Sequence, residues 1–142
     1  MRSVAVGVVI ASVVACSAPT ILQPRTPRYD EITALWTQIR EWRKEAHMPL
    51  DPFQQDVIQM ANRPAKEARL TCPDHHAVPK TCNDVCNLAD DICDNAERIC
   101  DLADQLGKQD DWAQGKCASA KASCREAKQK CCECSKKEEQ PQ

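Results

Sequence analysis

Ten of the eleven cysteines in this 142-residue chain lie between Cys72 and Cys134, and their thiol groups are the side chains most able to do chemistry. Thiols form disulfides, bind soft metal ions or exchange with other thiols, depending on compartment and spacing. Six of them form two trios with seven-residue spacing: Cys86, Cys93 and Cys100, then Cys117, Cys124 and Cys131. Because seven residues make about two helical turns, each trio is predicted to lie along one face of its own helix.

The spacing of the trios also predicts how they pair. Gly107 and Asp110-Asp111 lie between them and supply a helix stop and a helix start. In an antiparallel hairpin, facing residues have a constant sum of residue numbers, and the pairs Cys100–Cys117, Cys93–Cys124 and Cys86–Cys131 all sum to 217. The pair Cys82–Cys134 sums to 216. The two cysteines that remain, Cys72 and Cys132, are then predicted to pair with each other. We predict five disulfides, of which the constant sum itself fixes only the first three.

Small residues and opposite charges support this register. The interface positions between the cysteines are alanines: Ala89, Ala96, Ala103, Ala120 and Ala127. They let the helices approach closely enough for disulfides, whose Cα atoms lie within about 7 Å. Residues 83–106 contain seven acids and one base, whereas residues 114–137 contain two acids and seven bases. The register predicts two ion pairs, Asp90 with Lys128 and Glu97 with Lys121.

The residues before the cysteine-rich region are predicted to cover the hairpin as an N-terminal helical segment, 27–70. Between Pro27 and Ala46 the apolar residues recur three and four apart: Ile32, Leu35, Trp36, Ile39 and Trp42. Thr26 is the predicted N-cap. This amphipathic face is expected to cover a stripe on the first hairpin helix, Val85, Ile92, Ile99 and Leu106.

A second N-terminal helix is predicted from Asp51-Pro52, with Pro64 kinking or restarting it. Its predicted apolar face consists of Phe53, Val57, Met60 and Ala61. A loop over 71–81 leads to the stapled hairpin, 82–137, and Thr81-x-x-Asp84 offers a capping box for its first helix. Residues 138–142 form a tail. The predicted fold class is therefore all-α: a disulfide-stapled antiparallel helical hairpin packed against one or two N-terminal amphipathic helices.

The remaining cysteine, Cys16, ends an apolar leader that begins with the basic Met1-Arg2 and is too short to span a bilayer. Val13-Val14-Ala15-Cys16 resembles the lipobox of bacterial lipoproteins. The resemblance implies that residues 1–15 are a signal peptide, that Cys16 receives a diacylglyceryl thioether and an acylated amino terminus, and that 16–26 form a tether. With Ser17 rather than Asp after the lipidated residue, we expect placement in the cell envelope at the outer membrane.

Composition agrees with an exported, non-nucleic-acid-binding domain. The net charge is −2, so no basic excess indicates a nucleic-acid partner. One Phe, one Tyr and three Trp give few large core side chains, and small exported domains of this kind rely on disulfides. The expected partners are a membrane, reached through the N-terminal lipid, and an envelope protein or polysaccharide.

Two further resemblances concern the hairpin. Its paired cysteines resemble in principle those of coiled-coil-helix-coiled-coil-helix domains, but six residues separate successive cysteines here where that family typically has nine, so no function is carried over. The stretch from Cys82 to Cys134, with Leu88-Ala89-Asp90-Asp91-Ile92-Cys93-Asp94, is similar to a group of uncharacterised cysteine-rich bacterial lipoproteins. That resemblance implies no activity.

Metal binding is the main alternative to a purely structural role. Cys72, His75, Cys82 and Cys86 have zinc-like ligand types and spacing, and Cys131, Cys132 and Cys134 form a thiolate cluster of the kind that Cu(I) favours. A copper site of this kind would resemble the cysteine-lined helical copper storage proteins. Both sites need reduced thiols, which an oxidising envelope disfavours, so we expect no metal and no other cofactor.

Enzymatic activity has less support. Cys131-x-x-Cys134 matches the motif of thiol oxidoreductases, but it lies at the predicted C-terminal end of a helix, where the dipole disfavours a thiolate. There is no nucleophile elbow or metalloprotease motif, and three glycines leave no phosphate-cradling loop. By elimination, the sequence favours a non-enzymatic structural or interaction module, with envelope Cu(I) or Zn binding as the alternative.

Overall fold

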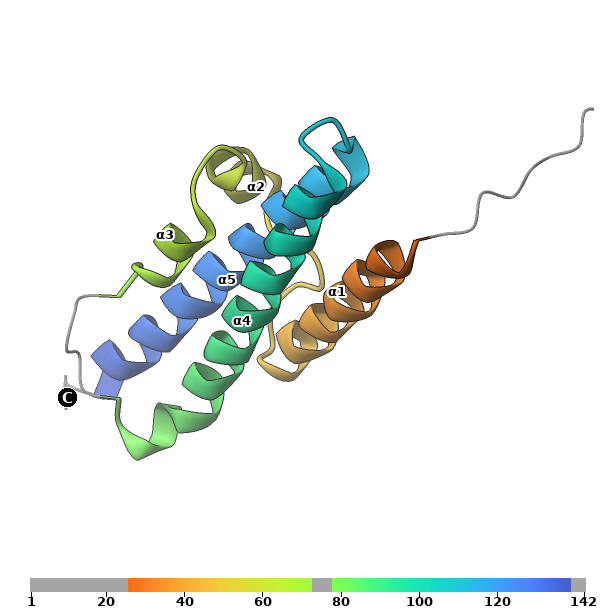
Figure 1. The fold of residues 1–142 in the computed structure, drawn as a ribbon. Coiled ribbons are helices and arrows are strands. Elements are labelled where there is room, and N and C mark those ends of the chain that lie inside the picture. Colours follow the sequence, from red (N-terminus) through yellow and green to blue (C-terminus); the bar gives the residue numbers. More distant parts are fainter. Residues whose placement is uncertain (1–25, 73–77, 139–142) are drawn as a thin grey trace, which may run out of the picture.

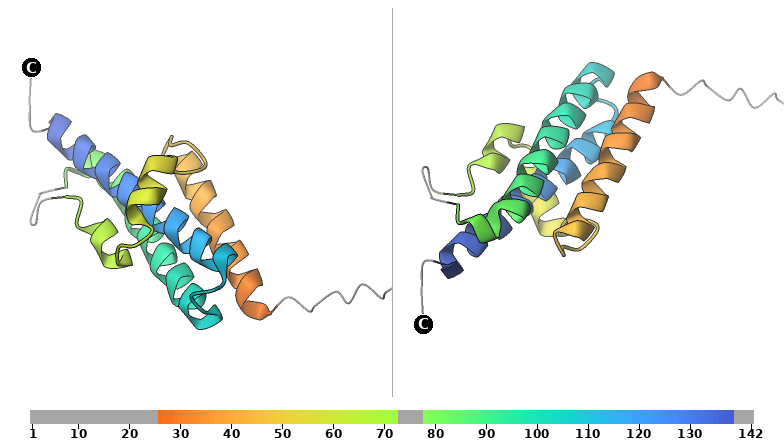
Figure 2. Two further views of the ribbon diagram at one scale, coloured as in Figure 1. Left: turned by 90° about the horizontal axis from the view of Figure 1, so that it is seen from above. Right: turned by 90° about the horizontal axis from the view of Figure 1, so that it is seen from below.

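Two long antiparallel helices, α4 and α5, form the centre of the fold (Figure 1). The structure is a computed structural model that describes residues 26–72 and 78–138. Its elements are α1 (Pro27–Glu45), α2 (Gln54–Met60), α3 (Ala65–Arg69), the 3₁₀ turn η1 (Lys80–Cys82), α4 (Asn83–Leu106) and α5 (Asp111–Glu138). In Figures 1 and 2, α1 lies along one side of the hairpin and α3 along the other, while α2 lies over α5. The predicted all-α, disulfide-stapled fold is confirmed.

The turn between α4 and α5 forms where the sequence predicts it. Gly107 ends α4 with a φ of 111°, in a region that favours glycine, and its N–H donates to the carbonyl of Ala103 at 3.0 Å. A side-chain oxygen of Asp110 accepts a hydrogen bond from the N–H of Ala113 at 2.9 Å. Asp110 therefore caps the start of α5, which fixes where the second helix begins.

The first helix covers α4 as predicted. Ile32 and Ile39 are fully buried and Trp36 is nearly so, and all three belong to the core that contains Ile92 and Ile99. Thr26 occupies the N-cap position, but its side chain makes no capping hydrogen bond. The contact between α1 and the hairpin therefore depends on buried apolar side chains rather than on the cap.

The second N-terminal helix differs from its prediction. Phe53 is the N-cap of α2 rather than a core residue, and its exposed fraction is 63%. Met60 is buried as expected, whereas Ala61 is exposed. The physical reason is that the backbone N–H of Phe53 bonds to a buried carboxylate of α5, which places Phe53 outside the helix. Pro64 restarts the chain as predicted, as the N-cap of α3.

The ends of the hairpin also differ in detail. The capping box predicted at Thr81 does not form, because η1 occupies Lys80–Cys82 and makes Cys82 the N-cap of α4, without a side-chain bond. The predicted loop over 71–81 therefore ends in a 3₁₀ turn. Helix α5 continues through Glu138, one residue into the expected tail.

Candidate functional site

Five disulfides join α5 to α4 and to the segment that precedes α4. The pairs are Cys100–Cys117, Cys93–Cys124, Cys86–Cys131, Cys82–Cys134 and Cys72–Cys132. The first three are those of the constant sum, and the last two are the pairs predicted from the cysteines that remain. The three pairs of the constant sum have Cα–Cα distances of 4.6, 4.6 and 4.8 Å, and the two outer pairs have 5.9 and 5.7 Å. The alanines predicted at the interface are all buried: Ala89, Ala96, Ala103, Ala120 and Ala127. Small side chains thus permit the close approach that the disulfides require.

Burial divides the ladder into a closed centre and more open ends. Cys93 and Cys124 have exposed fractions of 0% and 1%. Cys72, Cys100 and Cys134 are partly exposed. Since thiol exchange requires access to a disulfide sulfur, the ends of the ladder are chemically more accessible than its centre.

One predicted ion pair forms and the other does not. Lys128 pairs with Asp90. Glu97 instead accepts a hydrogen bond from Nε of Arg69, on α3, at 2.6 Å. Lys121 turns away from Glu97. The prediction for Glu97 was wrong because the sequence register considered only the two hairpin helices and not a third helix beside them.

Lys121 binds the end of α2. Its Nζ donates to the carbonyl oxygens of Ala61 and Arg63, at 3.1 and 2.7 Å, where helix carbonyls lack partners within the helix. Burial lowers the pKa of Lys121, and its exposed fraction is 5%. The residue predicted to bind within the hairpin therefore holds the N-terminal segment against it.

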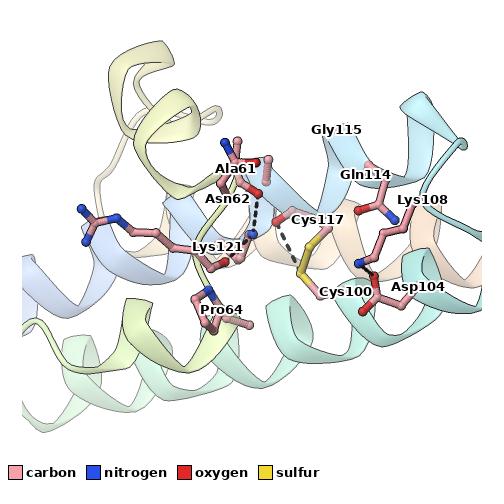
Figure 3. Close-up of a pocket in the computed structure, with 13 residues that line it drawn as sticks. Ala61, Asn62, Pro64, Cys100, Asp104, Lys108, Gln114, Gly115, Cys117 and Lys121 are labelled. Carbon is pink, nitrogen blue, oxygen red and sulfur yellow. Dashed lines mark hydrogen bonds and ion pairs between the residues drawn. A yellow bond between two sulfur atoms is a disulfide. The ribbon is translucent and has the colours of Figure 1, made fainter.

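Beside the first rung of the ladder is an open pocket of about 710 Å³ (Figure 3). Both Cys100 and Cys117 line it, together with the ion pair of Lys108 and Asp104 and with Lys121. The hydrogen bond from Lys108 holds the pKa of Asp104 below its usual value. In Figure 3 the disulfide lies between Lys121 and the Lys108–Asp104 pair. Both cysteines of this disulfide therefore face the same open pocket.

A buried ion pair joins α1 to α5, and sequence reasoning missed it. Nη2 of Arg43 lies 2.7 Å from Oε2 of Glu126, and the exposed fractions of these side chains are 0% and 7%. Arg43 also donates to the carbonyl oxygens of Pro49 and Asp51, at 2.7 and 3.2 Å. The N–H of Phe53 donates to Oε1 of Glu126 at 2.7 Å. The pair therefore fixes the connection between α1 and α2 on the surface of α5.

Burial has the largest effect on the pKa of Glu126 in this pair. Burial raises the pKa of Glu126 above its ordinary 4.5, while the bonds from Arg43 and from the N–H of Phe53 oppose that rise. Two buried charges lose their hydrogen bonds to water, and well-aligned partners within the protein must replace those bonds. The only hint in the sequence is that Arg43 follows Trp42 on the border of the apolar face, a position that long basic side chains also occupy in exposed helices.

The cysteines proposed as alternative metal ligands are bound to one another in disulfides: Cys72, Cys82, Cys86, Cys131, Cys132 and Cys134. His75, the remaining candidate ligand, lies outside the described residues. Across residues 26–72 and 78–138, no three metal-ligating side chains come together. Metal binding by these cysteines would therefore require their disulfides to be reduced first.

The two cysteines of the C-x-x-C motif are not joined to each other. Cys131 binds Cys86 and Cys134 binds Cys82. A dithiol motif of an oxidoreductase works by closing a disulfide within itself. Here both residues instead serve to cross-link α5 to the start of α4.

Three regions predicted from the sequence lie outside the described residues: the signal peptide 1–15, the lipidation site Cys16 with most of its tether, and the tail after Glu138. Within the described ranges, none of the helices combines the length and apolar character needed to cross a bilayer.

Comparison of the chain with protein-family models, with curated proteins and with solved structures finds no match. The functional argument therefore rests on the residues and their geometry.

Proposed function

We propose that this protein is a membrane-anchored, non-enzymatic lipoprotein of the cell envelope whose stapled helical domain is a rigid structural or interaction module. The ladder of five disulfides carries the proposal. Disulfides persist in oxidising compartments and are typical of small exported domains with few large core side chains. The lipobox-like Val13-Val14-Ala15-Cys16 adds an anchor to such a domain.

Two surface regions are suited to contact with an envelope component. Leu50, Phe53 and Ile58 are large apolar residues with exposed fractions of 45%, 63% and 60%. Lys136 and Lys137 are exposed at the end of α5. Exposed apolar residues near charged ones are common at protein contacts, whereas a basic surface suits anionic polysaccharide.

The basic face is smaller than its sequence suggests. Arg125 donates to Gln59 at 2.8 Å, and Lys130 donates to the carbonyl oxygen of His47 at 3.2 Å. Both residues therefore act partly within the protein. Lys136 and Lys137 are the better candidates for contact with an anionic partner.

The anchor is tested by membrane fractionation of cells that express the full chain. Cys16→Ser should move the protein from the membrane to the soluble fraction, because the thioether cannot form, while Ser17→Ala should leave it on the membrane. Persistent membrane association of the Cys16→Ser variant would contradict the proposal. Labelling with a fatty-acid analogue provides the chemical readout, and only Cys16→Ser should abolish the label.

The interaction role is tested by co-sedimentation with purified envelope polysaccharide and by cross-linking in intact cells. A double variant, Lys136→Glu with Lys137→Glu, should reduce polysaccharide binding at low salt. If Phe53→Ser instead abolishes a specific protein cross-link, the apolar surface is the contact. If both variants keep polysaccharide binding and the protein cross-link, both surface assignments are contradicted.

Metal content of the protein isolated without reductant separates this proposal from the metal-binding alternative. A disulfide sulfur is not a thiolate, so the proposal expects no bound Cu or Zn at stoichiometric level. One or more equivalents of either metal, together with free thiols, would favour metal binding.

A further inference from the structure

We propose that the Cys100–Cys117 disulfide is a site of thiol–disulfide exchange with small anionic thiols, which enter through the pocket beside it. This inference goes beyond the structural role of the ladder, because it assigns a reaction to one rung. It depends on three features of the described residues: access to the sulfurs, the charge of the pocket, and the asymmetry of the two cysteines.

Both cysteines of this disulfide line one open pocket. Cys100 is partly exposed, Cys117 has an exposed fraction of 7%, and both line the 710 Å³ pocket. The residues that line the pocket with these cysteines include the small Gly115 and Ala118, which leave room for a reagent. Cys134 also lines pockets, but its partner Cys82 is fully buried. Cys72 is also partly exposed and its partner Cys132 has an exposed fraction of 6%, so exposure alone does not separate these two bonds; the basic residues of the pocket favour attack on the Cys100–Cys117 bond.

The charge of the pocket favours an anionic reagent. Three of its lining residues are basic, Arg63, Lys108 and Lys121; Lys108 pairs with Asp104, the one acid that lines the pocket, and Arg63 lies 3.5 Å from Glu67, so the remaining charge is positive. A cleft lined mainly by one sign of charge raises the local concentration of the opposite sign. The attacking species in exchange is itself an anion, and a second negative group on it adds to the attraction.

The two sulfurs are not equivalent. Asp104 follows Cys100 by four residues on α4, and Lys121 follows Cys117 by four residues on α5, so each charged group shares a helix face with its cysteine. The ammonium of Lys121, which the carbonyl oxygens of Ala61 and Arg63 hold at the pocket, adds positive charge on the side of Cys117 and favours a leaving thiolate there, whereas the carboxylate of Asp104 opposes a thiolate on Cys100. Attack is therefore directed at Sγ of Cys100, which is also the more exposed of the two.

The reaction is a simple exchange. A thiolate RS⁻ attacks Sγ of Cys100, a new S–S bond forms between them, the Cys100–Cys117 bond breaks, and the electron pair leaves on Sγ of Cys117 as a thiolate. A second RS⁻ attacks the sulfur of the reagent in the mixed disulfide and releases RSSR. The thiolate of Cys100 then leaves, so both cysteines are reduced and the thiol reagent is oxidised.

The experiment uses 2-mercaptoethanesulfonate as the anionic thiol and cysteamine as the cationic one, with the oxidised full-length protein under native conditions. Free thiols are blocked with N-ethylmaleimide at successive times. Trypsin then separates the two cysteines without reduction, because Arg98 and Lys108 flank Cys100 while Lys116 and Lys121 flank Cys117. Mass spectrometry identifies which peptide carries the reagent and which carries the block.

We expect the Cys100–Cys117 bond to open before the other four, with the reagent on Cys100 and the block on Cys117. Per unit of thiolate, the sulfonate should react about tenfold faster than cysteamine at low salt, and the two rates should converge as salt is raised. Earlier opening of Cys72–Cys132 or Cys82–Cys134, simultaneous opening of all five, or a faster reaction with cysteamine would overturn the proposal. So would a reagent adduct found mainly on Cys117.

A matched pair of variants at Gly115 tests the role of charge without disturbing the core. A Cβ at Gly115 meets no atom within 4 Å, so Gly115→Glu and Gly115→Gln are both expected to fold. Gly115→Glu should slow exchange with the sulfonate relative to Gly115→Gln, and should slow exchange with cysteamine less. Equal rates for the two variants with the sulfonate would show that the pocket does not guide the reagent, and would contradict the proposal.

Discussion

The α4–α5 hairpin and the N-terminal segment of α1, α2 and α3 are held in place by different forces. Four of the five disulfides lie within the hairpin and its 3₁₀ turn, and the fifth reaches only to Cys72, after α3. The N-terminal segment instead packs through buried apolar side chains such as Ile32, Ile39 and Met60, and through the Arg43–Glu126 pair. One half of this protein is therefore fixed covalently and the other by packing, so the two halves should unfold under different treatments.

Reduction of all five disulfides should have the largest effect. The hairpin interface consists of alanines and cysteines, which bury little area each, so its stability depends on the cross-links. Closing the Cys100–Cys117 loop alone contributes about 3 kcal/mol on the chain-entropy estimate, and the outer rungs add less than a simple sum. Thermal unfolding followed by circular dichroism should show loss of the cooperative transition on reduction. A reduced protein that unfolds at the same temperature would contradict this expectation.

Breaking the buried ion pair should have the next largest effect. Arg43→Met or Glu126→Leu alone leaves one buried charge without its partner, and we expect each to lower the free energy of unfolding by about 3–5 kcal/mol. The double variant should recover part of that loss, because it leaves no unpaired buried charge, whereas the N–H of Phe53 and the carbonyl oxygens of Pro49 and Asp51 still lose their partners. Chemical denaturation of the four proteins measures the coupling between the two residues.

The exposed ion pair of Glu31 and Arg98 serves as the matched control. Its partners are 41% and 49% exposed, so replacing either should change the free energy of unfolding by only about 0.2–1 kcal/mol. If Glu31→Gln costs as much as Glu126→Leu, burial is not what distinguishes the two pairs.

Truncation of one buried side chain on α1 should loosen the N-terminal segment without opening the hairpin. Ile39 is fully buried between α1 and the hairpin core, and Ile39→Ala is expected to cost about 2–5 kcal/mol. Hydrogen exchange should then become faster in α1 while the amides of α4 remain protected. Thr37→Ala, at an exposed position on the same helix, is the control. Equal loss of protection in both halves would show that they unfold as one unit.

The smallest expected effect concerns pH at the hairpin turn. Hydrogen bonds from the Tyr29 hydroxyl and from the Ala113 N–H hold the pKa of Asp110 below its ordinary 3.8. Since the folded pKa is depressed, this contribution to stability is present above that ordinary value and is lost as the pH falls through the folded pKa. Asp110→Asn should be less stable than the natural protein at pH 7, and the difference should shrink on acidification. A difference that grows at low pH would contradict the assigned shift.

Much of the hairpin could be predicted because its information is local or periodic. Seven-residue spacing placed Cys93 and Cys124 on facing sides, Gly107 and Asp110 marked the turn, and alanine positions identified the interface. Each of these signals depends on only one or two helices. The pairing of Asp90 with Lys128 followed from the same register.

The side-chain pairings that could not be predicted involve a third element. Glu97 binds Arg69 because α3 lies beside the hairpin, and Lys121 binds carbonyl groups at the end of α2. The burial of Arg43 depends on Glu126, which is 83 residues away in the chain. No periodic pattern records such contacts, because a single charged residue on the border of an apolar face fits an exposed helix equally well.

The proposed function depends on a fully oxidised, covalently fixed helical hairpin. Intact mass spectrometry tests it most directly, on protein isolated from its host without reductant and alkylated under denaturing conditions with a chelator present. We predict no alkylated cysteine between Cys72 and Cys134, and disulfide-linked peptides that match the five pairs. Several alkylated cysteines, or linked peptides that join other pairs, would contradict the account.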